Sequence, residues 1–183
     1  MPVSLGNAAL ACGFLCSLAG MWSGVRGARR SSLKDVVRLK TLASLSLLAA
    51  LGAVMLMQIA LLTNDSSVAF VATHGSSRTP FPFNVATMWS ALEGSILLWG
   101  TMVAALTVLV LRKFRSQMQD PLVAWAMVVM FAVSGFFFAL MLTAAPVFRN
   151  SGKPLGFDGP GPNPLLQDHV LVAFHPPMLY LGY

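Results

Sequence analysis

Charged residues are scarce in this sequence of 183 residues: Asp, Glu, Lys and Arg make up 10% of it, against about 25% in a typical soluble domain. Acidic residues are the rarest class, with 6 Asp and Glu against 12 Lys and Arg. This composition excludes a disordered chain, a coiled coil and an ordinary soluble enzyme. The two cysteines do not form a pair at metal or redox spacing, which argues against a disulfide-stabilised scaffold.

Hydrophobic residues are abundant, at 56% of the sequence, and the mean hydropathy is +0.73. They gather into four runs long enough to cross a bilayer, which takes about 20 apolar residues. These runs predict transmembrane helices at about 3–25, 42–62, 92–111 and 122–144. In the first, Gly20-x-x-x-Gly24 permits close helix packing. The sequence thus predicts an all-α polytopic membrane protein, with residues 1–183 forming a single membrane domain.

The basic residues predict the orientation of the chain. Two short connections, after the first and the third run, hold nine of the twelve Lys and Arg: Arg26, Arg29, Arg30, Lys34, Arg38, Lys40, Arg112, Lys113 and Arg115. The positive-inside rule places both connections in the cytoplasm and the N-terminus outside. We therefore expect a bacterial inner membrane, or alternatively a mitochondrial inner membrane with these loops in the matrix. Cations confined to such loops do not indicate a nucleic-acid partner.

The other two segments, 64–91 and 146–183, are long for connecting loops, and long loops are usually functional. Both are rich in apolar and aromatic residues, and all three histidines, His74, His169 and His175, fall in them. The membrane runs contain no ionisable residue at mid-membrane, where ion pathways usually have one. This favours chemistry on the outer face over ion transport, and no catalytic residue is assigned.

His175 has the most informative context of the three histidines. Pro176 and Pro177 follow it and precede an apolar run, which predicts the first turn of a fifth membrane helix with His175 at or just before its N-terminus. A neutral imidazole is a common metal ligand. Phe174 before it, with Met178 and Tyr180 after it, would offer an apolar wall to a flat cofactor.

Glu93 is expected near the outer end of the third membrane helix. Helical spacing would place Trp89, Glu93 and Ile96 on one face. Glu93 then either stabilises the helix N-terminus through the dipole or braces the outer segments through hydrogen bonds. These two interpretations are equally supported by the sequence.

Three ordered motifs resemble those of a known family. They are Trp89-x-x-x-Glu93-Gly94-Ser95-x-Leu97-Leu98-Trp99, then Asn163-Pro164-Leu165-Leu166-Gln167-Asp168, then Phe174-His175-Pro176-Pro177-x-Leu179-Tyr180-x-Gly182-Tyr183. Together they resemble the N-terminal part of the CcmF-type haem lyase of the system I cytochrome c maturation pathway.

The resemblance implies a role in cytochrome c biogenesis. The family receives haem from a haem chaperone and, with other maturation subunits, attaches it to the Cys-x-x-Cys-His motif of apocytochrome c. His175 matches the first of two outer axial ligands of the haem iron, which implies that Phe174, Pro176, Pro177 and Tyr180 surround that haem. The family also holds a permanent haem b, whose ligands would lie in a downstream part.

The family's members are several times longer than this chain, so we expect a fragment or one piece of a split protein, inactive as a lyase by itself. Two alternatives remain open. One is a membrane subunit of a transporter or respiratory complex, and the other is the nitrite-reductase-specific paralogue of the same family.

Overall fold

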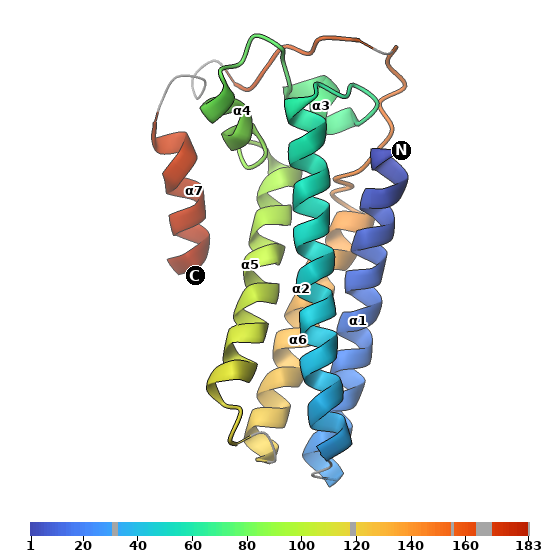
Figure 1. Cartoon of the computed structure of the whole chain (residues 1–183), viewed down its shortest axis with the longest axis vertical. Helices are drawn as coiled ribbons and strands as arrows, with labels where there is room; N and C mark the ends of the chain where they lie inside the picture. The colour runs from blue at the N-terminus through green and yellow to red at the C-terminus, as the bar shows by residue number, and fades with distance from the viewer. Residues whose placement is uncertain (31–32, 118–119, 155, 164–169, 183) are drawn as a thin grey trace.

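The computed structural model describes residues 1–30, 33–117, 120–154, 156–163 and 170–182. Within these ranges the regular structure is helical, apart from one isolated β-bridge between Val68 and Asn150. Figure 1 shows the long helices side by side in a bundle, with short helices and irregular chain gathered at one end.

The four long helices are the predicted membrane spans, and each is long and apolar enough to cross a bilayer. They are α1 (Pro2–Arg30), α2 (Leu33–Leu62), α5 (Leu92–Lys113) and α6 (Pro121–Leu142). Asp120 caps α6, since its carboxylate accepts a hydrogen bond of 2.8 Å from the Leu122 N–H. The first two helices extend further than the apolar runs predicted, because Arg, Lys and Leu are good helix formers and continue the helix past the hydrocarbon.

Helix α1 packs closely on α6 because its glycines admit aromatic rings. Three glycines spaced seven residues apart each lie beneath a ring: Gly6 beneath Phe148, Gly13 beneath Phe138 and Gly20 beneath Phe131. Gly24 lies against Val128 in the same way, so a Cβ there would be 2.7 Å from that side chain. The prediction of close packing at Gly20-x-x-x-Gly24 is therefore confirmed.

Large apolar side chains cover much of the outside of the bundle. Leu48 is 62% exposed, Val129 61% and Phe136 61%. Such a surface suits lipid rather than water, because apolar area this extensive is rare on soluble monomers. The fold is that of an all-α polytopic membrane protein, as the sequence predicts.

At one end of the bundle, two segments distant in sequence are joined by backbone hydrogen bonds. The first carries α3 (Ala69–His74) and α4 (Phe81–Thr87), and the second follows α6. The Ala69 N–H donates to the Arg149 carbonyl at 2.7 Å, and the Ser151 N–H donates to the Ser67 carbonyl at 3.0 Å. We call these two segments, 63–91 and the described residues of 143–163, the outer cap, because the positive-inside rule predicts that this end of the bundle lies outside.

Helix α7 (Leu171–Gly182) starts at the level of α4 and runs alongside α5 (Figure 1). It begins four residues before His175, so the expectation that His175 lies at the helix N-terminus is wrong. Pro176 and Pro177 lie inside the helix, where a missing N–H usually breaks the hydrogen-bond ladder.

Candidate functional site

The first motif forms a tight corner between α4 and α5. The chain turns through 88–91, and the Met88 carbonyl oxygen then lies directly against the α-carbon of Gly94, where any Cβ would overlap it. The Ser95 hydroxyl closes the corner by donating to the Trp89 carbonyl at 2.8 Å. Trp89 therefore precedes α5, and the prediction that it shares one helical face with Glu93 and Ile96 is wrong.

Trp89 links this corner to α7. Its indole Nε1–H donates a hydrogen bond of 2.8 Å to the Val172 carbonyl. In an uninterrupted helix that carbonyl would accept from the N–H four residues later, but this residue is Pro176, which has no N–H. The indole replaces the missing donor, so the Val172 carbonyl, which is half-buried, keeps a hydrogen-bond partner although Pro176 follows it in α7.

Trp99 contacts the same side of α7 about two turns further along, at Tyr180 rather than Val172. Its ring stacks on Tyr180 with centroids 5.6 Å apart and planes 13° from parallel, and it also contacts the Phe137 ring at 4.9 Å. Val172, Pro176 and Tyr180 follow one another at intervals of four residues, so they share one face of the helix. The two tryptophans of the first motif thus fix that face against α5.

The opposite face of α7 carries His175 and is open. Leu171 is 59% exposed, Phe174 63% and Met178 68%, and His175 between them is exposed as well. These residues share a face by their spacing of three and four. Of the predicted haem surroundings, the structure places Phe174 beside His175, whereas Tyr180 lies on the tryptophan side and Pro176 and Pro177 are half-buried between.

The second motif is described only in part. Asn163 ends the described part of the segment after α6, while Pro164, Gln167, Asp168 and the third histidine, His169, lie outside the described residues.

His74 has a local role. As the last residue of α3, it places its Nδ1 2.9 Å from the Thr73 hydroxyl and 3.3 Å from the Phe70 carbonyl oxygen. Its ring packs on the Phe70 ring with centroids 4.8 Å apart. His74 is half-buried in these contacts, so its Nδ1 is engaged within the cap.

Glu93 lies in the first turn of α5, where a carboxylate interacts favourably with the helix dipole. It also lines a small cavity of about 170 Å³ together with Phe70, Thr73, Pro146 and Arg149. These residues come from both segments of the cap. Its place at a helix start agrees with the first interpretation, and the cavity places it beside both segments that the second interpretation would have it brace.

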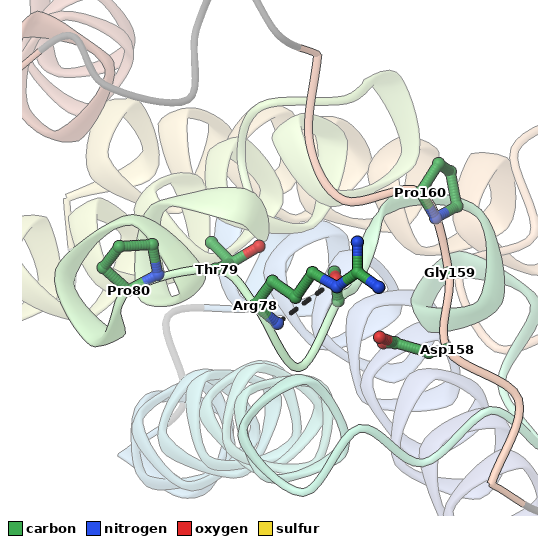
Figure 2. Close-up of a pocket in the computed structure, with 7 residues that line it drawn as sticks. Arg78, Thr79, Pro80, Asp158, Gly159 and Pro160 are labelled. Carbon is green, nitrogen blue, oxygen red and sulfur yellow. Dashed lines mark hydrogen bonds between the residues drawn. The ribbon is translucent and has the colours of Figure 1, made fainter.

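A larger polar cavity, of about 670 Å³, lies within the outer cap. Figure 2 shows Arg78 and Asp158 at its wall, contributed by the two different segments. The Arg78 N–H donates to the Ser76 hydroxyl at 3.3 Å, which shapes the turn that carries the guanidinium. Sequence reasoning missed this cavity, because the residues that line it lie about 80 positions apart and carry no motif.

Asp158 joins the two segments through its carboxylate. It accepts hydrogen bonds from the Ser77 N–H and the Ser77 hydroxyl, both at 2.8 Å, and from the Asn64 amide at 3.1 Å. These donors, the Ser77 N–H first, hold the pKa of the Asp158 carboxyl below its ordinary value. The cap is therefore expected to be tightest when this group is ionised.

The cap should loosen in acid. Because the pKa of Asp158 is lower in the folded protein, its contribution to stability is complete above the ordinary aspartate pKa of about 4 and is lost as the pH falls through the folded value. We expect the backbone amides of 75–80 to lose hydrogen-exchange protection, corrected for the intrinsic rate, when the pH is lowered below about 4. Asp158→Ala should lower that protection at pH 7 and remove its pH dependence. Unchanged protection at pH 7 would contradict this role.

Comparison with known proteins agrees with this arrangement. A sequence model of the family described as "Cytochrome C assembly protein" matches residues 89–183, which begin at Trp89 and contain both tryptophans and α7. The chain belongs to the cytochrome c assembly protein family. The resemblance to the CcmF-type haem lyase is thereby confirmed at the level of the family.

Individual relatives of the family extend the match to the rest of the chain. "Cytochrome c-type biogenesis protein CcmF" of Escherichia coli (strain K12) is 33% identical over 176 residues, 96% of this chain and 26% of the relative. The CcmF protein of Pseudomonas fluorescens is 39% identical over 125 residues, 68% of this chain and 18% of the relative. "Probable cytochrome c-type biogenesis protein NrfE" of Escherichia coli is 35% identical over 123 residues, 67% of this chain and 22% of the relative.

A solved structure of the family has the same fold. The chain titled "Cytochrome c Heme Lyase CcmF" superposes with a TM-score of 0.80 at 31% identity, over 100% of this chain and 28% of that one. The chain thus spans about a quarter of the length of the E. coli CcmF relative and of this structure. The relatives are bacterial, so this is a multi-pass membrane protein of bacterial type.

Proposed function

We propose that this chain acts in cytochrome c biogenesis as part of a haem lyase and contributes His175 as one axial ligand of the incoming haem. The observation that carries the proposal is that one face of α7 is packed against the protein while the opposite face is exposed. Trp89 and Trp99 fix one face, and His175 stands exposed on the other with Phe174 beside it. Family membership supports the haem-lyase hypothesis over a transporter or a respiratory subunit.

The donor set fits a haem. An imidazole is an ordinary axial ligand of haem iron, and the exposed Leu171, Phe174 and Met178 offer the porphyrin an apolar surface. The haem, here the substrate, supplies the reactive vinyl groups. The protein's own contribution is to bind the haem and orient it. Because the tryptophan contacts fix the position of α7, the backbone that carries His175 does not have to rearrange when haem binds.

Partners follow from the same proposal. A haem chaperone would deliver the haem to the open face of α7, and apocytochrome c would present its thiols there, with other maturation subunits completing the site. Of the residues described, those on the tryptophan side of α7 are already packed against α5 and α4. The His175 face is therefore the one on which we place haem and both protein partners.

We also propose that the outer cap and the N-terminus face away from the cytoplasm. The structure supports this because the cap contains Arg78, Arg149 and Lys153, while the other nine Lys and Arg lie at or near the opposite end. By the positive-inside rule, this distribution favours an orientation with the cap outside. Reporter fusions at Lys34 are expected to read cytoplasmic and fusions at Arg78 external. The reverse pattern would overturn the orientation.

The haem proposal is tested by absorbance spectroscopy. The protein is purified after co-production with a haem chaperone, and a Soret band at a stoichiometric ratio of haem to protein is expected. Protein produced without the chaperone should carry less haem. Absence of a Soret band under both conditions would contradict the proposal.

A further inference from the structure

The end of the bundle opposite the outer cap carries a basic groove that the haem proposal does not use. It lies between α2 and α5 and has a volume of about 470 Å³, within the range of about 300–1,000 Å³ that is typical of ligand pockets. Its lining is Lys40, Ala43, Ser44, Val108, Leu111, Arg112 and Arg115.

On both helices the basic residues of the groove lie nearer the end of the bundle, and its uncharged residues lie further inside. On α2, Lys40 lies nearer the helix end, and Ala43 and Ser44 lie about one turn deeper in the bundle. On α5, Arg112 lies at the helix end and Val108 lies one turn deeper. A rim of positive charge thus stands above a floor that is apolar except for the small side chain of Ser44 and leads into the membrane-spanning part of the bundle.

Among the residues that the structure describes, the rim cations Lys40, Arg112 and Arg115 make no ion pair. Over the ranges that the structure describes, the one recorded ion pair joins Arg38 to Asp35, at 3.5 Å. Asp120, at the same end of the bundle, is engaged in capping α6. Lys40, Arg112 and Arg115 are exposed, so their charges are available to a ligand.

We propose that this groove binds one anionic phospholipid, with its phosphate at the Lys40–Arg112–Arg115 rim and an acyl chain over Ala43, Ser44 and Val108. Basic pockets between membrane helices are suited to anionic headgroups, because several cations meet one phosphate close to the hydrocarbon. A free phosphate would satisfy the rim and leave the apolar floor without a ligand. The depth order therefore favours a lipid over a soluble anion.

Charge variants test the rim. The purified protein in neutral detergent is titrated with phosphatidylglycerol, and bound lipid is counted by native mass spectrometry. One lipid per chain should bind, and Lys40→Gln and Arg112→Gln should each weaken binding about fivefold, the effect expected for one basic residue near an anionic lipid. Lys113→Gln is the matched control: it removes the same charge from the same helix end, and Lys113 does not line the groove. It should change binding less than twofold.

A steric variant tests the floor. Ser44 is exposed in the groove, so Ser44→Phe should fill the apolar part and displace the lipid while it leaves every charge in place. Thermal unfolding without lipid should be unchanged in this variant and in the charge variants.

Three results would overturn the proposal. An equal loss of lipid in Lys113→Gln would indicate general surface charge. Equal binding of phosphatidylcholine would exclude a role for the headgroup charge. Competition by glycerol 3-phosphate as effective as by phosphatidylglycerol would show a site for a soluble anion. The haem spectrum of Lys40→Gln should stay that of the unmodified protein. A failure of the lipid proposal can therefore be distinguished from a failure of the haem proposal.

Discussion

Gly94→Ala is expected to lower the free energy of unfolding by about 3 kcal/mol or more, the upper range for overpacking at a buried site. The added Cβ would overlap the Met88 carbonyl oxygen, which is backbone and has no alternative rotamer. The corner between α4 and α5 would have to open, and with it the bond that the Ser95 hydroxyl makes to Trp89. Unfolding by denaturing detergent measures the effect.

Gly52→Ala is the matched control for this substitution. Gly52 lies inside α2, and a Cβ there would meet no atom within 4 Å. The same chemical change should therefore be neutral or stabilising by up to about 1 kcal/mol, because alanine favours a helix over glycine. Similar destabilisation of the two variants would contradict the role assigned to Gly94.

Trp89→Phe is expected to cost about 1–2 kcal/mol and to release α7, because the Val172 carbonyl loses the donor that replaces the Pro176 N–H. Hydrogen exchange over 170–182 should rise. Trp125→Phe makes the same chemical change at a position on α6 that is 47% exposed, and it should leave α7 protected.

Pro176→Ala sharpens this prediction. An alanine N–H at position 176 can donate to Val172 within α7, so the indole bond becomes redundant. Trp89→Phe should then cost clearly less in the Pro176→Ala background than in the natural sequence. Additive effects of the two substitutions would show that Trp89 does not act through the Val172 carbonyl.

Much of the fold was predictable because bilayer crossing imposes simple demands. Apolar runs of about 20 residues fix the number of spans, and all four predicted helices are present. Their ends were less predictable, since Arg26–Arg30 and Lys34–Lys40 are polar and yet continue the helices. The glycines spaced by seven in α1 were visible in the sequence, but their aromatic partners on and after α6 lie more than 100 residues away.

The site was predictable in its residues and less so in its geometry. The motifs single out Trp89, Gly94, Trp99 and His175, and the structure brings the two tryptophans against the helix that carries His175. The start of that helix was misplaced because prolines ordinarily mark a first turn. The tertiary contact with Trp89 replaces the donor that Pro176 lacks, and a contact across 83 residues leaves no local signal.

The most direct test of the central claim is the haem content of His175→Ala, purified after co-production with the haem chaperone, with His74→Ala as its matched control. Removal of an iron ligand should lower bound haem at least about tenfold, while α7 keeps its hydrogen-exchange protection because the tryptophan contacts remain. His74→Ala removes an imidazole that is packed within the cap, and it should keep its haem. Normal haem content in His175→Ala, with an unchanged Soret band, would contradict the assignment of His175 as the ligand.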